Sequence, residues 1–171
     1  MKMWKRLAAA VLAAVLTMAM LTACGGDAPV VRDKETETKV VGWIQEYMSS
    51  KGYTVTKDAK LDPVVDVAMP GTVKSWNAYD NGNTSEANKQ AAQMKMAVQK
   101  QFSTTGKKAF YYMTRRGSSS ITQADVNAIM NSQIDSIVNG LKSYGVSAPK
   151  SIAVGVTTQA NVTYIFIIVS D

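Results

Sequence analysis

Histidine is absent from all 171 residues of the chain, and cysteine occurs once, at Cys24. The protein therefore has neither the commonest general acid–base group nor the commonest zinc ligand, and histidine-dependent catalytic triads are excluded. A single cysteine cannot form an internal disulfide, and without histidine it cannot contribute to a Cys/His metal site. Asp58, Asp62 and Asp66 recur every four residues, but they do not form an EF-hand calcium loop. We expect no cofactor and no metal site.

The charge of the chain is positive but not concentrated. The formal net charge is +6, and half of it comes from Lys2, Lys5 and Arg6 at the N-terminus. The only local basic pairs in the rest of the chain are Lys107-Lys108 and Arg115-Arg116. A nucleic-acid-binding surface needs a denser basic stripe. We therefore expect no nucleic-acid partner.

The N-terminus has the three parts of an export signal. Its basic residues are followed by an apolar run from Leu7 to Leu21, and no acidic residue occurs before Asp27. This run is shorter than the roughly 20 apolar residues that span a membrane comfortably. A basic start, a short apolar stretch and small residues after it are typical of a signal peptide.

The apolar run ends in the sequence Leu21-Thr22-Ala23-Cys24. This sequence resembles the lipobox of bacterial lipoproteins, in which an aliphatic residue and two small residues precede a modified cysteine. The resemblance implies a signal peptide over residues 1–23, cleavage after Ala23 and a lipid on Cys24. The lipid would bind a membrane and hold the protein on the outer side of the cytoplasmic membrane, or on an outer membrane if the host has one. An uncleaved anchor and an ordinary export signal are the alternatives.

The residues after Cys24 divide into a tether and one domain. Gly25, Gly26 and the charged run that begins at Arg32 predict a flexible tether over residues 24–37. Residues 38–171 have the length of one ordinary domain and contain no internal repeat, so we predict a single globular domain.

The spacing of apolar residues predicts an α+β domain. Helices are predicted over 38–50, 85–102 and 124–141, and strands over 53–56, 109–114, 151–157 and 161–169. The last strand is apolar on both sides and should lie centrally in its sheet. The segment from Leu61 to Met69 suits a helix that begins at Asp62-Pro63, or a strand, and Pro70-Gly71 should end it before a turn-rich stretch over 72–84. The fold class is α+β, with a small antiparallel or mixed sheet packed with about three helices, and an α-β-α sandwich is one such arrangement.

Three segments of the domain carry a family resemblance. The third helix contains Val126-Asn127-Ala128-Ile129-Met130-Asn131-Ser132, the next strand contains Ile152-Ala153-Val154-Gly155-Val156, and the last strand contains Tyr164-Ile165-Phe166. Together these segments resemble the CAP superfamily (cysteine-rich secretory and pathogenesis-related proteins), over roughly residues 38–169. The resemblance implies an α-β-α sandwich with a groove for a lipid or a wall fragment. Asp135 stands where the family has a histidine, so no metal site is implied.

Aromatic and basic residues are the candidate contacts to a ligand or partner. They are Trp43, Trp76, Tyr79, Tyr111, Tyr112, Arg115 and Arg116. Aromatic side chains beside a flexible loop can line a ligand site, and the alternative for each of them is packing at the edge of the core.

Export, a lipid tether and the absence of common catalytic groups predict a non-catalytic binding module on the cell surface. Its candidate ligands are a small apolar molecule, a wall polymer or an envelope protein. One alternative is a structural subunit of an envelope assembly, with the apolar final strand as an exposed edge. Another is a histidine-free hydrolase that uses Ser118-Ser119-Ser120 or the carboxylates of Glu46 and Asp66. We predict that the protein is not an enzyme.

Overall fold

A computed structural model of the protein describes residues 29–171. The predicted signal peptide over residues 1–23, the lipobox and Cys24 lie outside the described residues. From Val31 to Asp171 the chain is one compact unit. Its elements are α2 (Lys34–Ser50), β1 (Thr56–Lys57), the short 3-10 helix η1 (Ala59–Leu61), α3 (Asp62–Asp80), α4 (Thr84–Ser103), β2 (Ala109–Arg116), α5 (Gln123–Ser143), β3 (Ser151–Gln159) and β4 (Val162–Ser170).

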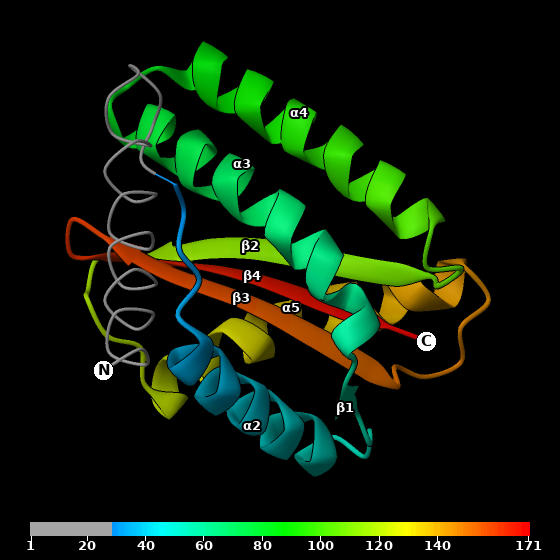
Figure 1. Ribbon diagram of the computed structural model, residues 1–171. Helices are drawn as coiled ribbons and strands as arrows, with labels where there is room; N and C mark the ends of the chain where they lie inside the picture. The colour runs from blue at the N-terminus through cyan, green and yellow to red at the C-terminus, as the bar shows by residue number, and fades with distance from the viewer. Residues whose placement is uncertain (1–28) are drawn as a thin grey trace, which may run out of the picture. The chain divides into compact units, whose positions relative to one another are not determined.

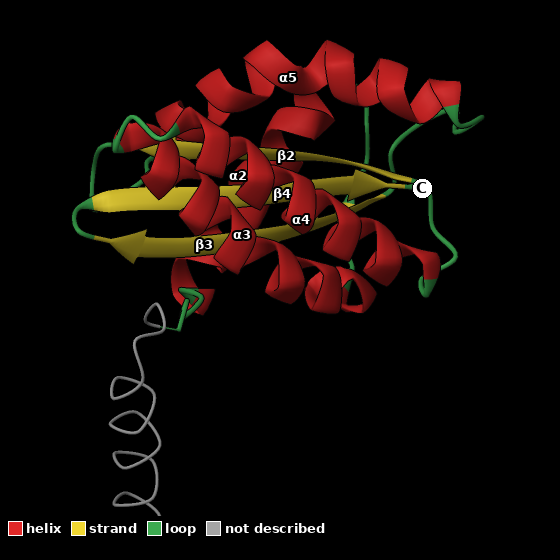
Figure 2. Cartoon of the chain, turned by 90° about the horizontal axis from the view of Figure 1, so that it is seen from above, coloured by secondary structure: helices red, strands yellow, loops and turns green. Residues whose placement is uncertain are grey.

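The elements form three layers, with a four-stranded sheet in the middle (Figure 1). The strand order is β1-β3-β4-β2; the three long strands are antiparallel, and the short β1 runs parallel to β3. Helices α3 and α4 lie on one side of the sheet, and α2 and α5 lie on the other (Figure 2). This confirms the predicted α+β class with a mixed sheet. The described residues contain four α-helices, one more than predicted, because 62–80 is a helix.

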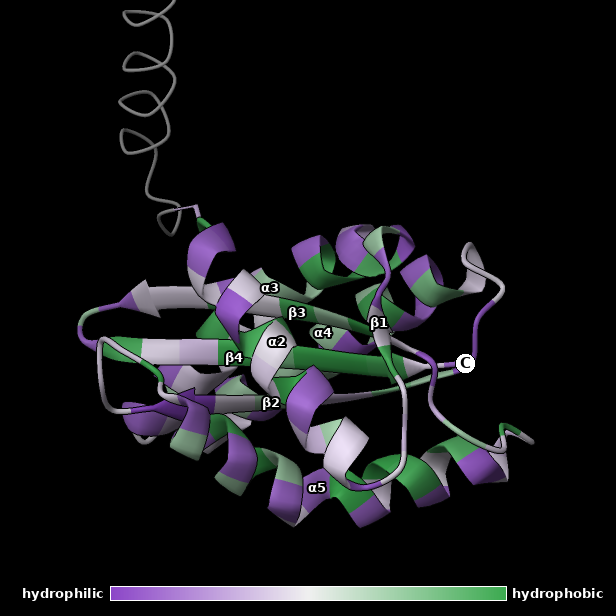
Figure 3. Cartoon of the chain, turned by 90° about the horizontal axis from the view of Figure 1, so that it is seen from below, coloured by the Kyte–Doolittle hydropathy of each residue, from purple (hydrophilic) through white to green (hydrophobic). Residues whose placement is uncertain are grey.

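Strand β4 lies in the centre of the sheet, as its apolar sequence predicts. It pairs with β3 on one side and with β2 on the other, and its residues from Thr163 to Ser170 are buried. The hydrophobic colour in Figure 3 is accordingly strong on β3 and β4, while the helices carry both colours. The turn between the two strands places Ala160 and Asn161 at positive φ (49° and 62°), the conformation that two-residue hairpin turns require. A central β4 cannot be the exposed edge that the structural-subunit alternative requires.

The hydrophobic core between the sheet and α2 and α5 follows the predicted helical spacing. Val40 and Ile44 of α2 and Met130 and Leu141 of α5 are fully buried in one cluster with the apolar odd-numbered residues of β4, Ile165, Ile167 and Val169. Helix α5 begins with the predicted capping box, in which Thr122 and Asp125 bind each other's main-chain N–H groups.

Helix α3 contradicts the predicted break at Pro70-Gly71 and the predicted turn-rich stretch over 72–84. The helix continues through both residues to Asp80, and only the turn after Asp80 is as predicted. Pro70 removes one helical hydrogen bond, at a cost of about 3 kcal/mol. The α3 residues on both sides of Pro70 are buried against the sheet and α4, and this burial outweighs the cost of the lost hydrogen bond. These buried residues are Val64, Val65, Ala68, Met69, Thr72 and Val73.

Gly71 is required where it stands because α3 and α4 approach each other closely there. A Cβ atom on Gly71 would lie 2.5 Å from Cβ of Met94 in α4, which is closer than two non-bonded carbon atoms approach each other in proteins. The Pro-Gly pair that the sequence presents as a helix terminator is thus part of a helix–helix contact. Local pattern alone does not reveal this, since Met94 lies more than 20 residues further along the chain.

The domain begins earlier than predicted, and residues 31–37 do not belong to a tether. Helix α2 starts at Lys34, with Asp33 as its N-cap, and the side chain of Arg32 is buried. Arg32 binds Glu37 in α2, Asp62 and Asp66 in α3, and the main-chain oxygen of Val154 in β3. The charged run that predicts a solvated tether is instead an ion-pair network that joins α2, α3 and the sheet.

Candidate functional site

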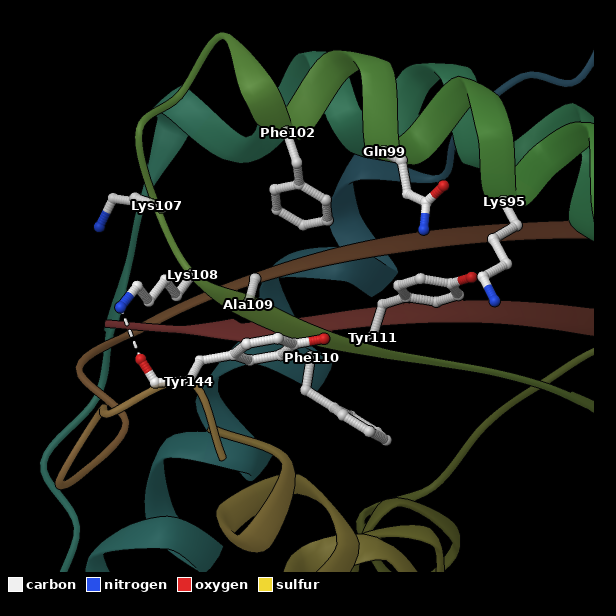
Figure 4. Close-up of a pocket in the computed structure, with 9 residues that line it drawn as sticks. All are labelled: Lys95, Gln99, Phe102, Lys107, Lys108, Ala109, Phe110, Tyr111 and Tyr144. Carbon is white, nitrogen blue, oxygen red and sulfur yellow. Dashed lines mark hydrogen bonds between the residues drawn. The ribbon is translucent and has the colours of Figure 1, made fainter. Parts of the chain in front are cut away.

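A pocket of about 540 Å³ lies along the free edge of β2, between that strand, α4 and the end of α5 (Figure 4). Its volume falls within the range of small-molecule sites, about 300–1,000 Å³. The lining residues come from three segments: Lys95, Gln99 and Phe102 of α4, Lys107, Lys108, Ala109, Phe110 and Tyr111 at the start of β2, and Tyr144 after α5.

The hollow exists because α4 does not cover the sheet directly. Helix α3 packs on β3 and β4, whereas α4 packs chiefly on α3 (Figure 1). The outer strand β2 therefore has part of its α4-side surface uncovered. Phe102 closes the pocket from α4, and the ring of Tyr144 reaches it from the end of α5 (Figure 4).

The free edge of β2 presents main-chain groups to the pocket. Asp171 N donates to Lys108 O (3.2 Å), so these residues form a hydrogen-bonded pair of the β2–β4 ladder. Bonding direction alternates along an antiparallel strand, and the main-chain groups of Ala109 and Tyr111 therefore point away from β4. Among the described residues no further strand pairs with this edge. A ligand in the pocket can bond to these groups without breaking a protein hydrogen bond.

Two of the three lysines in the pocket are engaged within the protein. Lys107 Nζ forms an ion pair with Asp58 (3.0 Å) and donates to the main-chain oxygen of Asp171 (2.7 Å). Lys108 Nζ donates to the main-chain oxygen of Tyr144, and Lys108 N donates to the Asp171 carboxylate (3.0 Å). The pKa of Asp58 is lowered by the hydrogen bond from the main-chain N–H of Lys60 and by Lys107, so Asp58 is charged at neutral pH. Both ammonium groups at this end of the pocket are therefore engaged within the protein.

Lys95 stands at the other end of the pocket. It is exposed, and no carboxylate of the described residues pairs with it. Figure 4 shows its ammonium group and the amide of Gln99 near the hydroxyl end of Tyr111. Burial raises the pKa of Tyr111, so its hydroxyl keeps its proton at neutral pH and can donate a hydrogen bond. This end of the pocket therefore combines a free positive charge with neutral polar groups.

Of the residues predicted from the sequence to contact a ligand, only Tyr111 lines the pocket. Three others form a separate cluster at the opposite end of β2. The guanidinium of Arg115 lies over the Trp76 ring (4.9 Å to its centroid) and pairs with Asp80, and Tyr79 packs edge-on against Trp76 (5.8 Å between centroids). Trp76 and Tyr79 lie on helix α3, and this corrects the prediction of a loop.

The remaining predicted contacts lie on the other face of the sheet, toward α2 and α5. Trp43 and Tyr112 are half-buried and pack against the hydrophobic core. Arg116 pairs with Asp125 at the start of α5 (2.9 Å). Neighbouring residues of a strand point to opposite faces, so the side chains of Tyr111 and Tyr112 lie on opposite faces of the sheet, as do those of Arg115 and Arg116.

Most pocket residues were not predicted, and the sequence contains little to indicate them. Lys95 and Gln99 resemble any polar residues on the exposed side of a helix, and Tyr144 resembles an exposed residue after a helix. One pattern in the sequence could have indicated the pocket: the basic pair Lys107-Lys108 directly before an aromatic strand. A basic pair at the end of a strand is more simply interpreted as solvent-exposed. The pocket arises from the packing of α4 on α3, which no local pattern encodes.

Among the described residues, the side chains named for the hydrolase alternative are not assembled into a catalytic group. Ser118 and Ser120 contact each other (3.5 Å between hydroxyl oxygens), and no Lys, Asp or Glu side chain of the described residues binds either one. Glu46 in α2 accepts a hydrogen bond from Gln123 of α5. Asp66 lies in α3, on the other side of the sheet, and binds Arg32. The two carboxylates therefore serve different contacts on opposite faces of the sheet.

The three spaced aspartates are also divided between different partners. Asp58 pairs with Lys107, while Asp62 and Asp66 both bind Arg32. Within residues 29–171, no three His, Cys, Asp or Glu side chains lie close enough together to hold a metal ion. In the same part of the chain, no helix has the length and apolar character needed to cross a membrane.

Searches with the chain find no significant match among protein-family models, curated proteins or solved structures.

Proposed function

We propose that the protein is a lipid-anchored module of the bacterial cell envelope that binds a small ligand without chemical conversion. The observation that carries the binding role is the pocket between α4 and β2, which combines aromatic walls with a few polar groups. Small-molecule sites typically have this composition. The catalytic candidates in the sequence make contacts unrelated to the pocket, and this favours binding over chemistry.

The lipid anchor rests on the N-terminal sequence, from the basic start to Cys24. Since the folded unit starts at Val31, six residues, 25–30, separate the modified cysteine from the domain. Even a fully extended segment of this length reaches only about 25 Å. The domain would therefore work close to the membrane surface, on the outer side of the cytoplasmic membrane or on an outer membrane. The intact mass of protein extracted from bacterial membranes tests this: residues 24–171 plus lipid would support it, and an unmodified full-length chain would contradict it.

The CAP resemblance belongs to the same proposal. The layered arrangement of helices around one sheet agrees with the α-β-α sandwich that the resemblance implies. The motif residues Val126 and Met130 are buried in the core, so packing alone also accounts for them. Asp135 is exposed on α5, and no metal chemistry follows from it. An experimental structure that superposes on CAP proteins through all three layers would support the relationship, and a different strand order would contradict it.

The binding role can be tested with an uncharged apolar dye, N-phenyl-1-naphthylamine, which fluoresces when it leaves water. We would use a chain that begins at Gly25, since it keeps the whole compact unit and lacks the lipidation site. We expect saturable binding with a stoichiometry of one. Ala109→Trp, which places a large ring in the pocket, should abolish it, whereas the exposed Met96→Trp on α4 should not. Absence of binding, or binding that Ala109→Trp leaves unchanged, would contradict the proposal.

A further inference from the structure

We propose that the ligand of this pocket is an organic monoanion with an apolar body, and that Lys95 binds its charged group. This inference rests on the proposed binding function and adds the chemical class of the ligand.

Of the three lysines in the lining, only Lys95 has an ammonium group without a hydrogen-bond or ion-pair partner among the described residues. Lys107 Nζ pairs with Asp58, and Lys108 Nζ donates to the main-chain oxygen of Tyr144. On α4 the nearest acidic residue to Lys95 is Glu86, nine residues earlier, or about 13 Å along the helix axis. Glu86 already contacts Lys89 (3.3 Å) and Gln90 (2.6 Å). An anion at Lys95 therefore meets a cation and no competing carboxylate.

The groups around Lys95 are suited to an anion with several acceptor oxygens. The hydroxyl of Tyr111 is a neutral donor, because burial raises its pKa. Gln99 brings an amide to the same end of the pocket (Figure 4). The main-chain N–H of Tyr111 lies on the free edge of β2, with no strand beside it among the described residues. A carboxylate, sulfonate or phosphodiester oxygen can accept from each of these donors.

The rest of the lining is apolar and suits an uncharged body. The ring of Phe102 lies above the start of β2 and the ring of Tyr144 lies below it, with Ala109 between them (Figure 4). At the far end Lys107 pairs with Asp58 and Lys108 Nζ is held by the main-chain oxygen of Tyr144, so a second anionic group would have to displace these contacts beside the Asp171 carboxylate. The pocket therefore favours one negative charge and disfavours a dianion.

A matched pair of dyes tests this inference. 8-Anilinonaphthalene-1-sulfonate has the same ring system as N-phenyl-1-naphthylamine and adds one sulfonate. Lys95→Met should weaken binding of the sulfonate about fivefold and change binding of the uncharged dye less than about twofold, as expected for one partly exposed charge pair. Raising the ionic strength from about 0.01 to about 0.5 M should likewise weaken only the sulfonate. Lys95→Arg should keep wild-type affinity for both dyes.

The control is Lys100→Met, which removes the same charge from the exposed surface of the same helix without touching the pocket. It should leave both affinities within about twofold, since a single exposed charge at a distance is screened. If Lys95→Met leaves the sulfonate affinity unchanged, or weakens both dyes equally, the inference about the anion is wrong while binding of the uncharged dye still supports the binding function. If neither dye binds the wild-type protein, the proposed function itself fails.

Discussion

Arg32 and Glu37 form a bidentate ion pair, with Arg32 Nε 2.6 Å from Glu37 Oε1 and Arg32 Nη2 2.8 Å from Glu37 Oε2. Their side chains are 7 % and 1 % exposed. The pair ties the start of the domain to β3, because Arg32 also donates to Val154 O (2.9 Å) and Glu37 accepts from Val156 N (3.1 Å). Burial alone would lower the pKa of Arg32, but the hydrogen bonds to Glu37, Asp66 and Asp62 outweigh it and raise the pKa.

Removing one partner of this pair should be costly. Arg32→Met leaves the buried carboxylate of Glu37 with only Lys34 and the main-chain N–H of Val156, and we expect a loss of about 3–5 kcal/mol in the free energy of unfolding. Urea denaturation measures this. The control is Lys39→Met, which breaks the exposed pair with Glu35 and should cost less than about 1 kcal/mol. Equal effects of the two substitutions would show that the Arg32 network does not hold the domain together.

The close approach of α3 and α4 gives a second prediction. Gly71→Ala places a Cβ 2.5 Å from Cβ of Met94, so the helices must separate, and we expect destabilisation by about 1–3 kcal/mol. Gly42→Ala is the matched change in α2, where a Cβ meets nothing within 4 Å. It should stabilise the protein by about 0.5–1 kcal/mol, because alanine favours a helix more than glycine does. Thermal unfolding of both variants would be compared, and a stabilising Gly71→Ala would contradict the packing.

The capping box of α5 predicts a pH-dependent contribution to stability. The Thr122 hydroxyl and main-chain N–H, with Arg116 nearby, lower the pKa of Asp125. Since this pKa is lower in the folded than in the unfolded chain, the contribution is present above about pH 4 and is lost as the pH falls through the folded value. Asp125→Asn should therefore cost about 1 kcal/mol at neutral pH and almost nothing near pH 2.

The control for this experiment is Asp135→Asn, on an exposed turn of the same helix. It should change the free energy of unfolding by less than about 0.5 kcal/mol at either pH. Urea denaturation at a series of pH values gives both curves. A loss in Asp125→Asn that is the same at every pH would mean that the carboxylate charge plays no part in the cap.

Trp76 should tolerate loss of its nitrogen better than loss of its ring. Its Nε1 is buried without a hydrogen-bond partner, so Trp76→Phe removes an unsatisfied donor and should change stability by less than about 1 kcal/mol. Trp76→Ala removes the ring under Arg115 and beside Tyr79 and should cost about 2 kcal/mol or more. Chemical denaturation of the two variants distinguishes these effects. A large loss in Trp76→Phe would indicate a partner for Nε1, such as a bound water or ligand.

The fold was largely predictable wherever one local pattern determines an element. The apolar spacing of 124–141 and the Thr122–Asp125 box predicted α5, and the unbroken apolar run of β4 predicted its central place. The predictions were wrong where contacts with residues distant in the sequence determine the local structure. Pro70-Gly71 is a helix terminator by local propensity, but burial of α3 and the contact of Gly71 with Met94 keep the helix intact. The run beginning at Arg32 is a tether by composition, but Asp62, Asp66 and Val154 turn it into a buried network.

The 171-residue sequence contains no histidine and one cysteine, and it predicts export and a lipid on Cys24. It also determined the α+β class, since periodicity is a local property. The candidate site, in contrast, depends on tertiary packing. The pocket joins Lys95, Tyr111 and Tyr144, which are separated by up to 49 positions in the sequence. They meet because α4 packs on α3 rather than on the sheet and leaves the edge of β2 uncovered. The position of α4 depends on packing between whole helices and strands, which lie far apart in the sequence.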